Sequence, residues 1–173
     1  MKKNNIILIG FMGVGKGTIA RAIFEHKGKF SVDTDDLIEA MTKKKIKDIF
    51  AEHGEPYFRD LEKKCSLWLQ ECLDNSIIST GGGFYRQENL KEIGTVVYLE
   101  SSFDGILERI NACPNAKAKL KKRPLLQNLE EAKKLYDSRI EDYKRVSDLT
   151  ISVEKRDAVD IVNEIFKKIG KEA

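Results

Sequence analysis

The stretch Gly10-Phe-Met-Gly-Val-Gly-Lys-Gly-Thr18 decides how the rest of the chain is interpreted. From Gly10 to Lys16 it matches G-x-x-x-x-G-K, in which glycines let backbone N–H groups turn toward phosphate oxygens and the lysine reaches the terminal phosphates. Ile6 to Ile9, just before it, is a short apolar run typical of a buried parallel strand, and residues 16–26 have helical spacing. Because a nucleotide loop requires a strand before it and a helix after it, we predict nucleotide binding here.

Position 17 departs from the phosphate-loop pattern. A Ser or Thr hydroxyl normally follows the lysine and holds Mg²⁺, whereas this chain has Gly17 and then Thr18. Thr18 is not a simple replacement, since one helical step turns a side chain by about 100°. Our hypothesis is that a water takes the place of the hydroxyl, oriented by Asp33, while Thr18 bonds a phosphate; the alternative is a loop that no longer supports catalysis.

The composition is that of an ordinary globular protein. The chain has 173 residues, 41% hydrophobic and 34% charged, with a net charge of +3, which is too small to predict nucleic-acid binding. The cysteines at 65, 72 and 113 lack metal-ligand spacing and are expected in or near the core. No apolar run reaches the roughly 18 residues of a membrane span. We expect a single cytoplasmic domain over residues 1–173 that uses neither a membrane nor nucleic acid.

Short apolar runs alternate with longer amphipathic ones along the whole chain. This order predicts an α/β fold, a doubly wound five-stranded parallel sheet with helices on both faces. Ligands in such folds bind beyond the carboxyl ends of the strands. The expected strands are Ile6–Ile9, Phe30–Asp33, Ile77–Ser79, Val96–Leu99 and Leu149–Val153.

Chemically distinctive groups follow these strands. Asp33 to Asp36 ("DTDD") end the second strand, and Ser79 to Gly83 ("STGGG") end the third. On an extended segment Asp33 and Asp35 would share one side, Asp33 toward the phosphate loop and a metal ion and Asp35 toward a second ligand. One of these acids is also suited to capping a helix that starts at Leu37, with Asp35 or Asp36 as the cap. Three consecutive glycines indicate close approach of a ligand or another backbone.

Two arginines are notable for their positions in predicted helices. Arg59 lies near a helix start, where a cation is unfavourable, and Arg139 lies within a long helix. Surface pairing with Glu62 and Asp142, three residues further on in each case, is the simpler alternative. A basic run extends from Lys117 to Arg123, within a lid expected at about residues 114–126. Its composition alone indicates a solvated loop, and a role in binding phosphate is inferred only because a phosphate site is already predicted.

The ordered set of motifs resembles the shikimate kinase family. The matching segments are "GFMGVGK" (10–16), "DTDD" (33–36), "FRDLE" (58–62), "STGGG" (79–83), "RPLL" (123–126) and "SRIEDYKRVSD" (138–148). The resemblance covers essentially the whole chain. It implies a P-loop kinase fold with a mobile lid, and transfer of the γ-phosphate of ATP to the 3-hydroxyl of shikimate in aromatic amino-acid biosynthesis.

The resemblance also implies roles for individual residues. Lys16, Asp35 and Arg123 would be catalytic, and Asp33 would help to hold Mg²⁺, through water. The ATP-binding residues would be Gly13, Val14, Gly15, Lys16, Gly17, Thr18, Arg123 from the lid and Arg156 near the adenine. The shikimate-binding residues would be Asp35, Arg59, Gly82 and Arg139. Asp35 can accept a hydroxyl proton as general base, and two arginines can bind a carboxylate through charge-assisted bonds.

Three other functions compete with this one. A nucleoside monophosphate kinase often carries "GKGT", but "DTDD" with "STGGG" is not expected there. A gluconate-type kinase is disfavoured by the triple glycine. A non-catalytic nucleotide-binding regulator is suggested by Gly17, yet a chain that had lost catalysis would be expected to lose substrate residues too. The family resemblance suggests a monomer with ATP and shikimate as its partners.

Overall fold

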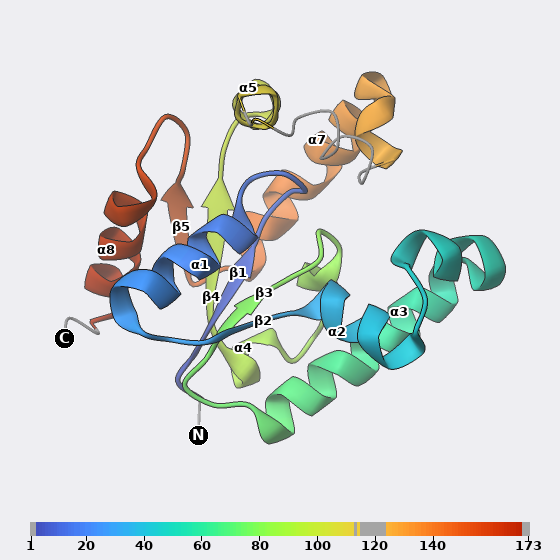
Figure 1. Ribbon diagram of the computed structural model, residues 1–173, viewed down its shortest axis with the longest axis horizontal. Coiled ribbons are helices and arrows are strands. Elements are labelled where there is room, and N and C mark those ends of the chain that lie inside the picture. Colours follow the sequence, from blue (N-terminus) through green and yellow to red (C-terminus); the bar gives the residue numbers. More distant parts are fainter. Residues whose placement is uncertain (1–2, 113, 115–123, 171–173) are drawn as a thin grey trace.

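The computed structural model describes residues 3–112, 114 and 124–170. Its centre is a five-stranded parallel sheet in the order β2-β3-β1-β4-β5, which confirms the predicted fold class (Figure 1). The strands are β1 Asn5–Ile9, β2 Ser31–Asp33, β3 Ile77–Ser79, β4 Gly94–Glu100 and β5 Leu149–Ser152. Every residue of β1 and β3 is buried, as expected for strands covered on both faces.

Helices cover both faces of this sheet. In Figure 1, α1 (Lys16–Lys27) and α8 (Ala158–Ile169) pack together on one face, and α7 (Leu129–Val146) crosses the other. The other helices in the described ranges are α2 (Thr34–Thr42), α3 (Ile46–Cys72), α4 (Leu90–Ile93) and α5 (Phe103–Asn111), with 3₁₀ turns at Phe84–Arg86 and Pro124–Gln127. No helix in the described ranges has the length and apolar character to cross a membrane.

Strand order explains why distant motifs meet. Because β3 lies between β2 and β1, Ser79 pairs in register with both Asp33 and Leu8. The loop after β1, the acids after β2 and the glycines after β3 therefore leave the same edge of the sheet. Thr80 Oγ1 donates to Leu8 O at 2.9 Å, and Gly81 N donates to Thr34 Oγ1 at 3.0 Å. These bonds fix the three segments to one another.

The start of α2 corrects one prediction. The helix begins at Thr34 rather than Leu37, so Asp35 and Asp36 belong to its first turn. Asp33 is the cap, and its Oδ1 accepts hydrogen bonds from Asp35 N at 3.0 Å and Asp36 N at 3.3 Å. The predictions that Asp35 or Asp36 caps the helix, and that Asp35 lies on an extended segment beside Asp33, were wrong. The one-residue side-chain alternation of a strand does not apply where the chain has already turned into a helix.

The segment "GEP" at 54–56 interrupts α3, whose two helical parts meet across a kink. Gly54 has φ +78° and ψ 175° inside α3, and Pro56 lies in the first turn after this kink. A small separate cluster of buried residues, Ile38, Ile49 and Phe58, ties α2 to both parts of α3. Of the two cysteines described, Cys65 is partly buried as predicted, whereas Cys72 is exposed.

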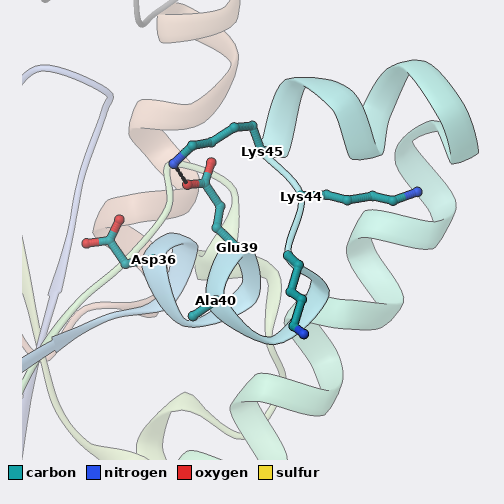
Figure 2. Close-up of a pocket in the computed structure, with 6 residues that line it drawn as sticks. Asp36, Glu39, Ala40, Lys44 and Lys45 are labelled. Carbon is teal, nitrogen blue, oxygen red and sulfur yellow. Dashed lines mark hydrogen bonds and ion pairs between the residues drawn. The ribbon is translucent and has the colours of Figure 1, made fainter.

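A shallow hollow lies where α2 meets the start of α3, lined by Asp36, Glu39, Ala40, Lys43, Lys44 and Lys45 (Figure 2). Figure 2 shows Lys45 reaching back to Glu39, and Lys45 Nζ lies 2.6 Å from Glu39 Oε2. Glu39 Oε1 accepts from Ile46 N at 2.9 Å, which satisfies an N–H group in the first turn of α3. The hollow contains none of the predicted substrate residues, and Glu39 has a structural role there.

Substitutions at Glu39 test this role. Glu39→Ala should lower the free energy of unfolding by about 1 kcal/mol, because an N–H group of α3 loses its cap. Glu39→Gln should cost less than half as much, since its amide oxygen can still accept from Ile46 N. Urea unfolding of the two variants measures the difference, and equal losses would show that the ion pair with Lys45, not the cap, stabilises this corner.

Candidate active site

The phosphate loop connects β1 to α1 with the geometry that its glycines allow. Gly13 and Gly15 have φ of +84° and +111°, a region that residues with a Cβ rarely adopt. Lys16, the first residue of α1, is 9% exposed, and its Nζ donates to Gly10 O at 2.6 Å and Phe11 O at 3.1 Å. The loop's own carbonyls thus hold the lysine at a helix N-terminus, where an anion is favoured.

Arg109 adds a cation to this loop, although it belongs to none of the sequence motifs. It lies near the end of α5, and a Cβ added to Gly15 would come within 2.6 Å of its Nη2. A side chain at position 15 would therefore displace the guanidinium from the phosphate loop. No local pattern reveals this contact, because it depends on how α5 packs after β4. The strand order, once known, places the helix that follows β4 beside the β1 loop.

Position 17 is sterically open. A Cβ at Gly17 would meet only Arg21 Nη1, at an ordinary contact distance of 3.6 Å. Thr18 is exposed, and its Oγ1 accepts a weak bond from Arg21 Nη2 at 3.4 Å. Neither packing nor a positive φ requires glycine here, so the Cβ of a serine would fit.

Both oxygens of the Asp33 carboxylate have protein partners. Besides capping α2 through Oδ1, Asp33 accepts from Ser79 Oγ through Oδ2 at 2.8 Å. These bonds fix the carboxylate at the end of β2, beside the loop that follows β3. Among the residues described, no group of three or more His, Cys, Asp and Glu side chains is arranged to hold a metal ion.

Asp35 is the most perturbed carboxyl in this region. Burial, reinforced by the negative charges of Asp33 and Glu62, raises its pKa to about 7. Its Oδ1 is buried and has no hydrogen-bond partner among the described residues. A carboxyl with these properties can exchange a proton near neutral pH, which is what a general base requires.

Arg59 is held by two carboxylates of its own helix. Its Nη1 donates to Glu62 Oε2 at 2.6 Å, and its Nη2 and Nε donate to Glu55 Oε1 at 2.7 and 3.0 Å. Glu62 is only 1% exposed, and burial raises the pKa of its carboxyl. The predicted pairing with Glu62 therefore occurs, but it positions the arginine beside the glycine loop instead of on a solvent-facing surface.

Arg139 reaches the same glycine loop from α7. It is 7% exposed, and its Nη1 donates to Gly82 O at 3.2 Å, the oxygen that also accepts from Tyr143 OH at 2.6 Å. Asp142 bonds Arg145 instead, at 2.5 Å, so the alternative of an Arg139–Asp142 surface pair was wrong. The Nε of Arg139 is buried without a partner in the described part of the chain.

Each of the three consecutive glycines faces one charged side chain. A Cβ at Gly81 would collide with the carboxylate of Asp35, and one at Gly83 would collide with the guanidinium of Arg59. A Cβ at Gly82 would lie 3.2 Å from Arg139 Nη1. The missing side chains therefore leave room for one acid and two arginines. The glycines were predicted to mark the close approach of a ligand or another backbone, and in the structure three charged side chains approach them.

The ATP contacts predicted for Arg123 and Arg156 are not tested by the structure. Arg156 Nη1 donates to Ser152 O at 2.8 Å and to Glu164 Oε2 at 2.6 Å on α8. Arg123 and most of the expected lid at 114–126 lie outside the described residues. Their predicted contacts with ATP stay predictions.

The fold and this site define a class of protein: a P-loop kinase, in which a lysine-bearing phosphate loop lies next to a glycine loop faced by one acid and two arginines. Comparison with known proteins agrees. The family model described as "Shikimate kinase" matches residues 12–170. The chain belongs to the shikimate kinase family and is an ATP-dependent kinase.

Relatives match over nearly their full lengths. A shikimate kinase of Helicobacter hepaticus is 38% identical over 168 residues, covering 97% of both chains. One of Persephonella marina is 40% identical over 172 residues, covering 95% of this chain and 98% of the relative. Among solved structures, the shikimate kinase of Acinetobacter baumannii in complex with shikimate has a TM-score of 0.82 at 34% identity, covering 96% of this chain and 93% of that one.

Proposed function

We propose that this kinase transfers the γ-phosphoryl group of ATP to the 3-hydroxyl of shikimate, giving shikimate 3-phosphate and ADP. One observation supports the acceptor site above all others. Within the described residues, the buried side-chain atoms that lack a hydrogen-bond partner are Asp35 Oδ1, Glu62 Oε1 and Arg139 Nε. Buried polar atoms are almost always bonded, so unused capacity at three charged groups beside one glycine loop favours a polar ligand there.

The charges of this cradle suit a hydroxylated acid. Arg59 and Arg139 would bind the substrate's carboxylate through charge-assisted hydrogen bonds. Asp35 would accept a hydrogen bond from the reacting hydroxyl and take its proton as the oxygen attacks phosphorus. Gly82 would let the substrate approach the backbone. A relative with the same fold, that of A. baumannii, has been solved with shikimate bound.

The phosphates of ATP would bind on the opposite side of the reacting hydroxyl. Backbone N–H groups of residues 13–18 and Lys16 would hold the β- and γ-phosphates, which places Lys16 and Asp35 on either side of the transferred group. The charge of Lys16 already lowers the pKa of Asp35 against the larger effect of burial, so the two groups are electrostatically coupled. Arg109 would add positive charge at the loop, Arg123 would come from the lid, and Arg156 would contact the adenine.

The residues present fit Mg²⁺ that arrives with ATP. Asp33 supplies a fixed carboxylate at the end of β2, and the space beside Gly17 is open for a water. Mg²⁺ commonly keeps several waters and uses few protein ligands, and when bound it neutralises charge on the β- and γ-phosphate oxygens. Asp33 would hold it through water, and Thr18 would bond a phosphate.

A substitution at position 17 tests this arrangement. Gly17→Ser restores the usual hydroxyl and should lower the Mg²⁺ concentration for half-maximal turnover by about three- to tenfold, the gain of one additional ligand bond. Gly17→Ala is the matched control, since it adds the Cβ and removes the flexibility of glycine, worth about 0.5–1 kcal/mol, without a hydroxyl. Identical Mg²⁺ titrations for the two variants would show that the missing hydroxyl is immaterial.

Coupled measurement of ADP release distinguishes the acceptors. With millimolar Mg²⁺–ATP, shikimate should support turnover, whereas AMP and gluconate should give no rate above the background without acceptor. Turnover with AMP alone would identify a nucleoside monophosphate kinase. ATP binding without turnover on any acceptor would favour a regulator.

The chain would act in the cytoplasm, as a monomer. Sedimentation at micromolar concentration tests the monomeric state directly.

A further inference from the structure

Arg59 carries more negative charge around it than it can neutralise. Its guanidinium bonds Glu55 on one side and Glu62 on the other, which places two carboxylates against one cation. A substrate carboxylate that approaches Arg59 would therefore meet a group with an excess of negative charge. Glu62 is buried and fixed, whereas the side chain of Glu55 is 54% exposed and follows the kink at Gly54.

Arg86 lies on the far side of Glu55. Its Nη1 is 3.4 Å from Glu55 Oε1, the oxygen that Arg59 also contacts. Arg86 ends the 3₁₀ turn Phe84–Arg86, directly after the triple glycine, and its guanidinium carbon lies 5.5 Å from the ring centroid of Tyr85. Because Tyr85 is 6% exposed and packs on Tyr143 with ring centroids 4.8 Å apart, the backbone that carries Arg86 is anchored to the cradle.

The charge of Arg86 acts on both acids around Arg59. Together with Arg59 it lowers the pKa of Glu55, and it opposes the rise that burial causes in the pKa of Glu62. Arg59 and Arg86 together balance the charges of Glu55 and Glu62, and Arg139 from α7 also lowers the pKa of Glu62. Without Arg86, Glu55 keeps Arg59 as its cationic neighbour but loses the second one, so the site becomes more negative by one charge where an anion has to bind.

We propose that Arg86 is a positioning and specificity-determining residue for anionic acceptors, which acts by neutralising Glu55 so that Arg59 can hold the substrate's carboxylate. This inference rests on the proposed role of Arg59 as a carboxylate ligand. Arg86 acts through Glu55 and does not touch the substrate. The effect is therefore electrostatic, weakened by salt, and confined to acceptor binding.

Steady-state kinetics with shikimate as the varied substrate test the proposal. Arg86→Gln should raise KM for shikimate about three- to tenfold at low salt, with kcat and the KM for ATP within about twofold of the wild type. Arg86→Lys should retain most of the wild-type affinity, because the charge matters more than its geometry. In about 0.5 M salt the difference should shrink to less than about twofold. Arg145→Gln is the matched control, since Arg145 also bonds a carboxylate, Asp142, on the surface of α7.

A double-mutant cycle with Glu55 decides how Arg86 acts. Glu55→Gln keeps an oxygen for Arg59 but removes the charge, so it should lower KM for shikimate by about two- to fivefold. In the Glu55→Gln background, Arg86→Gln should change KM by less than about twofold. An undiminished effect there would overturn the proposal, since Arg86 would then act on the substrate independently of Glu55. An unchanged KM for Arg86→Gln alone would overturn it as well.

Arg59→Gln separates this inference from the proposed function. It should raise KM for shikimate at least about tenfold, the loss expected for a charge-assisted bond. If it leaves KM unchanged, the proposed acceptor site is wrong and the inference about Arg86 falls with it. If it raises KM while Glu55 and Arg86 show no coupling, only the inference about Arg86 is wrong.

Discussion

Asp35→Asn is expected to reduce kcat by about 10²–10⁴-fold, the usual contribution of a general base. Asparagine keeps the size of the side chain and can still bond a hydroxyl, but it cannot take the proton. KM for shikimate should change much less than kcat, because the two arginines remain. Rapid-quench or coupled assays at saturating substrates measure the loss. A kcat within about threefold of the wild type would remove Asp35 from proton transfer.

The pH dependence of the same group follows from its raised pKa. Because Asp35 titrates at about 7, kcat/KM for the wild type should rise with pH and level off above that value. The contribution of Asp35 to the free energy of unfolding changes with pH in the opposite direction: it falls as pH rises. The folded state holds the proton more tightly than the unfolded state, so this contribution to stability is lost as pH rises from the ordinary aspartate pKa of 3.8 through about 7.

Asp35→Asn should therefore be more stable than the wild type above neutral pH. A carboxylate that is buried and ionised destabilises the fold, by up to about 4 kcal/mol for a pKa shift of this size. Urea unfolding at about pH 8 and about pH 5 should show a larger gain at the higher pH. An inactive enzyme that is also more stable points to a functional acid. A loss of both activity and stability would indicate that the carboxylate supports the fold.

Gly83→Ala has the second large expected effect. Its backbone, at φ −101° and ψ −6°, is compatible with alanine, so the added methyl group acts only by pushing the guanidinium of Arg59 aside. KM for shikimate should rise about 10- to 100-fold, since a displaced arginine loses a charge-assisted bond to the substrate's carboxylate. The free energy of unfolding should change by less than about 1 kcal/mol, because a flexible side chain can move.

The Arg59→Gln background provides the control for Gly83→Ala. With the guanidinium absent, the methyl group has nothing to displace, and adding Gly83→Ala to Arg59→Gln should raise KM by less than about twofold. Additive losses in the double variant would contradict the proposed collision, because they would place the methyl group against the substrate itself.

The phosphate loop and the sheet could be predicted from the sequence because they depend on local patterns. The motif from Gly10 to Lys16 is tied to one backbone conformation. Short apolar runs separated by amphipathic segments predict a parallel sheet without knowledge of the tertiary packing. The start of α2 could not be predicted in the same way. In "DTDD" each acid is suited to be a cap, and only the three-residue length of β2 decides that Asp33 is the one.

The arginines show where sequence reasoning ends. Arg59 and Arg139 each had a nearby acid on the same helix, and helical spacing gives no means of choosing between surface pairing and a ligand site. In the structure the two arginines differ. Arg59 bonds the acid on its own helix, Glu62, whereas Arg139 bonds the carbonyl of Gly82. Arg109 and Arg86 were missed because their partners, at Gly15 and Glu55, are brought to them only by the packing of separate elements.

Phosphorus NMR of the reaction mixture tests the central claim most directly. With equimolar Mg²⁺–ATP and shikimate, we predict one new phosphomonoester whose phosphorus couples to the proton on carbon 3 of the ring, formed in step with ADP. The same spectrum from Asp35→Asn should show almost no product over the same period. Release of inorganic phosphate without a shikimate ester, or an ester at another hydroxyl, would contradict the account.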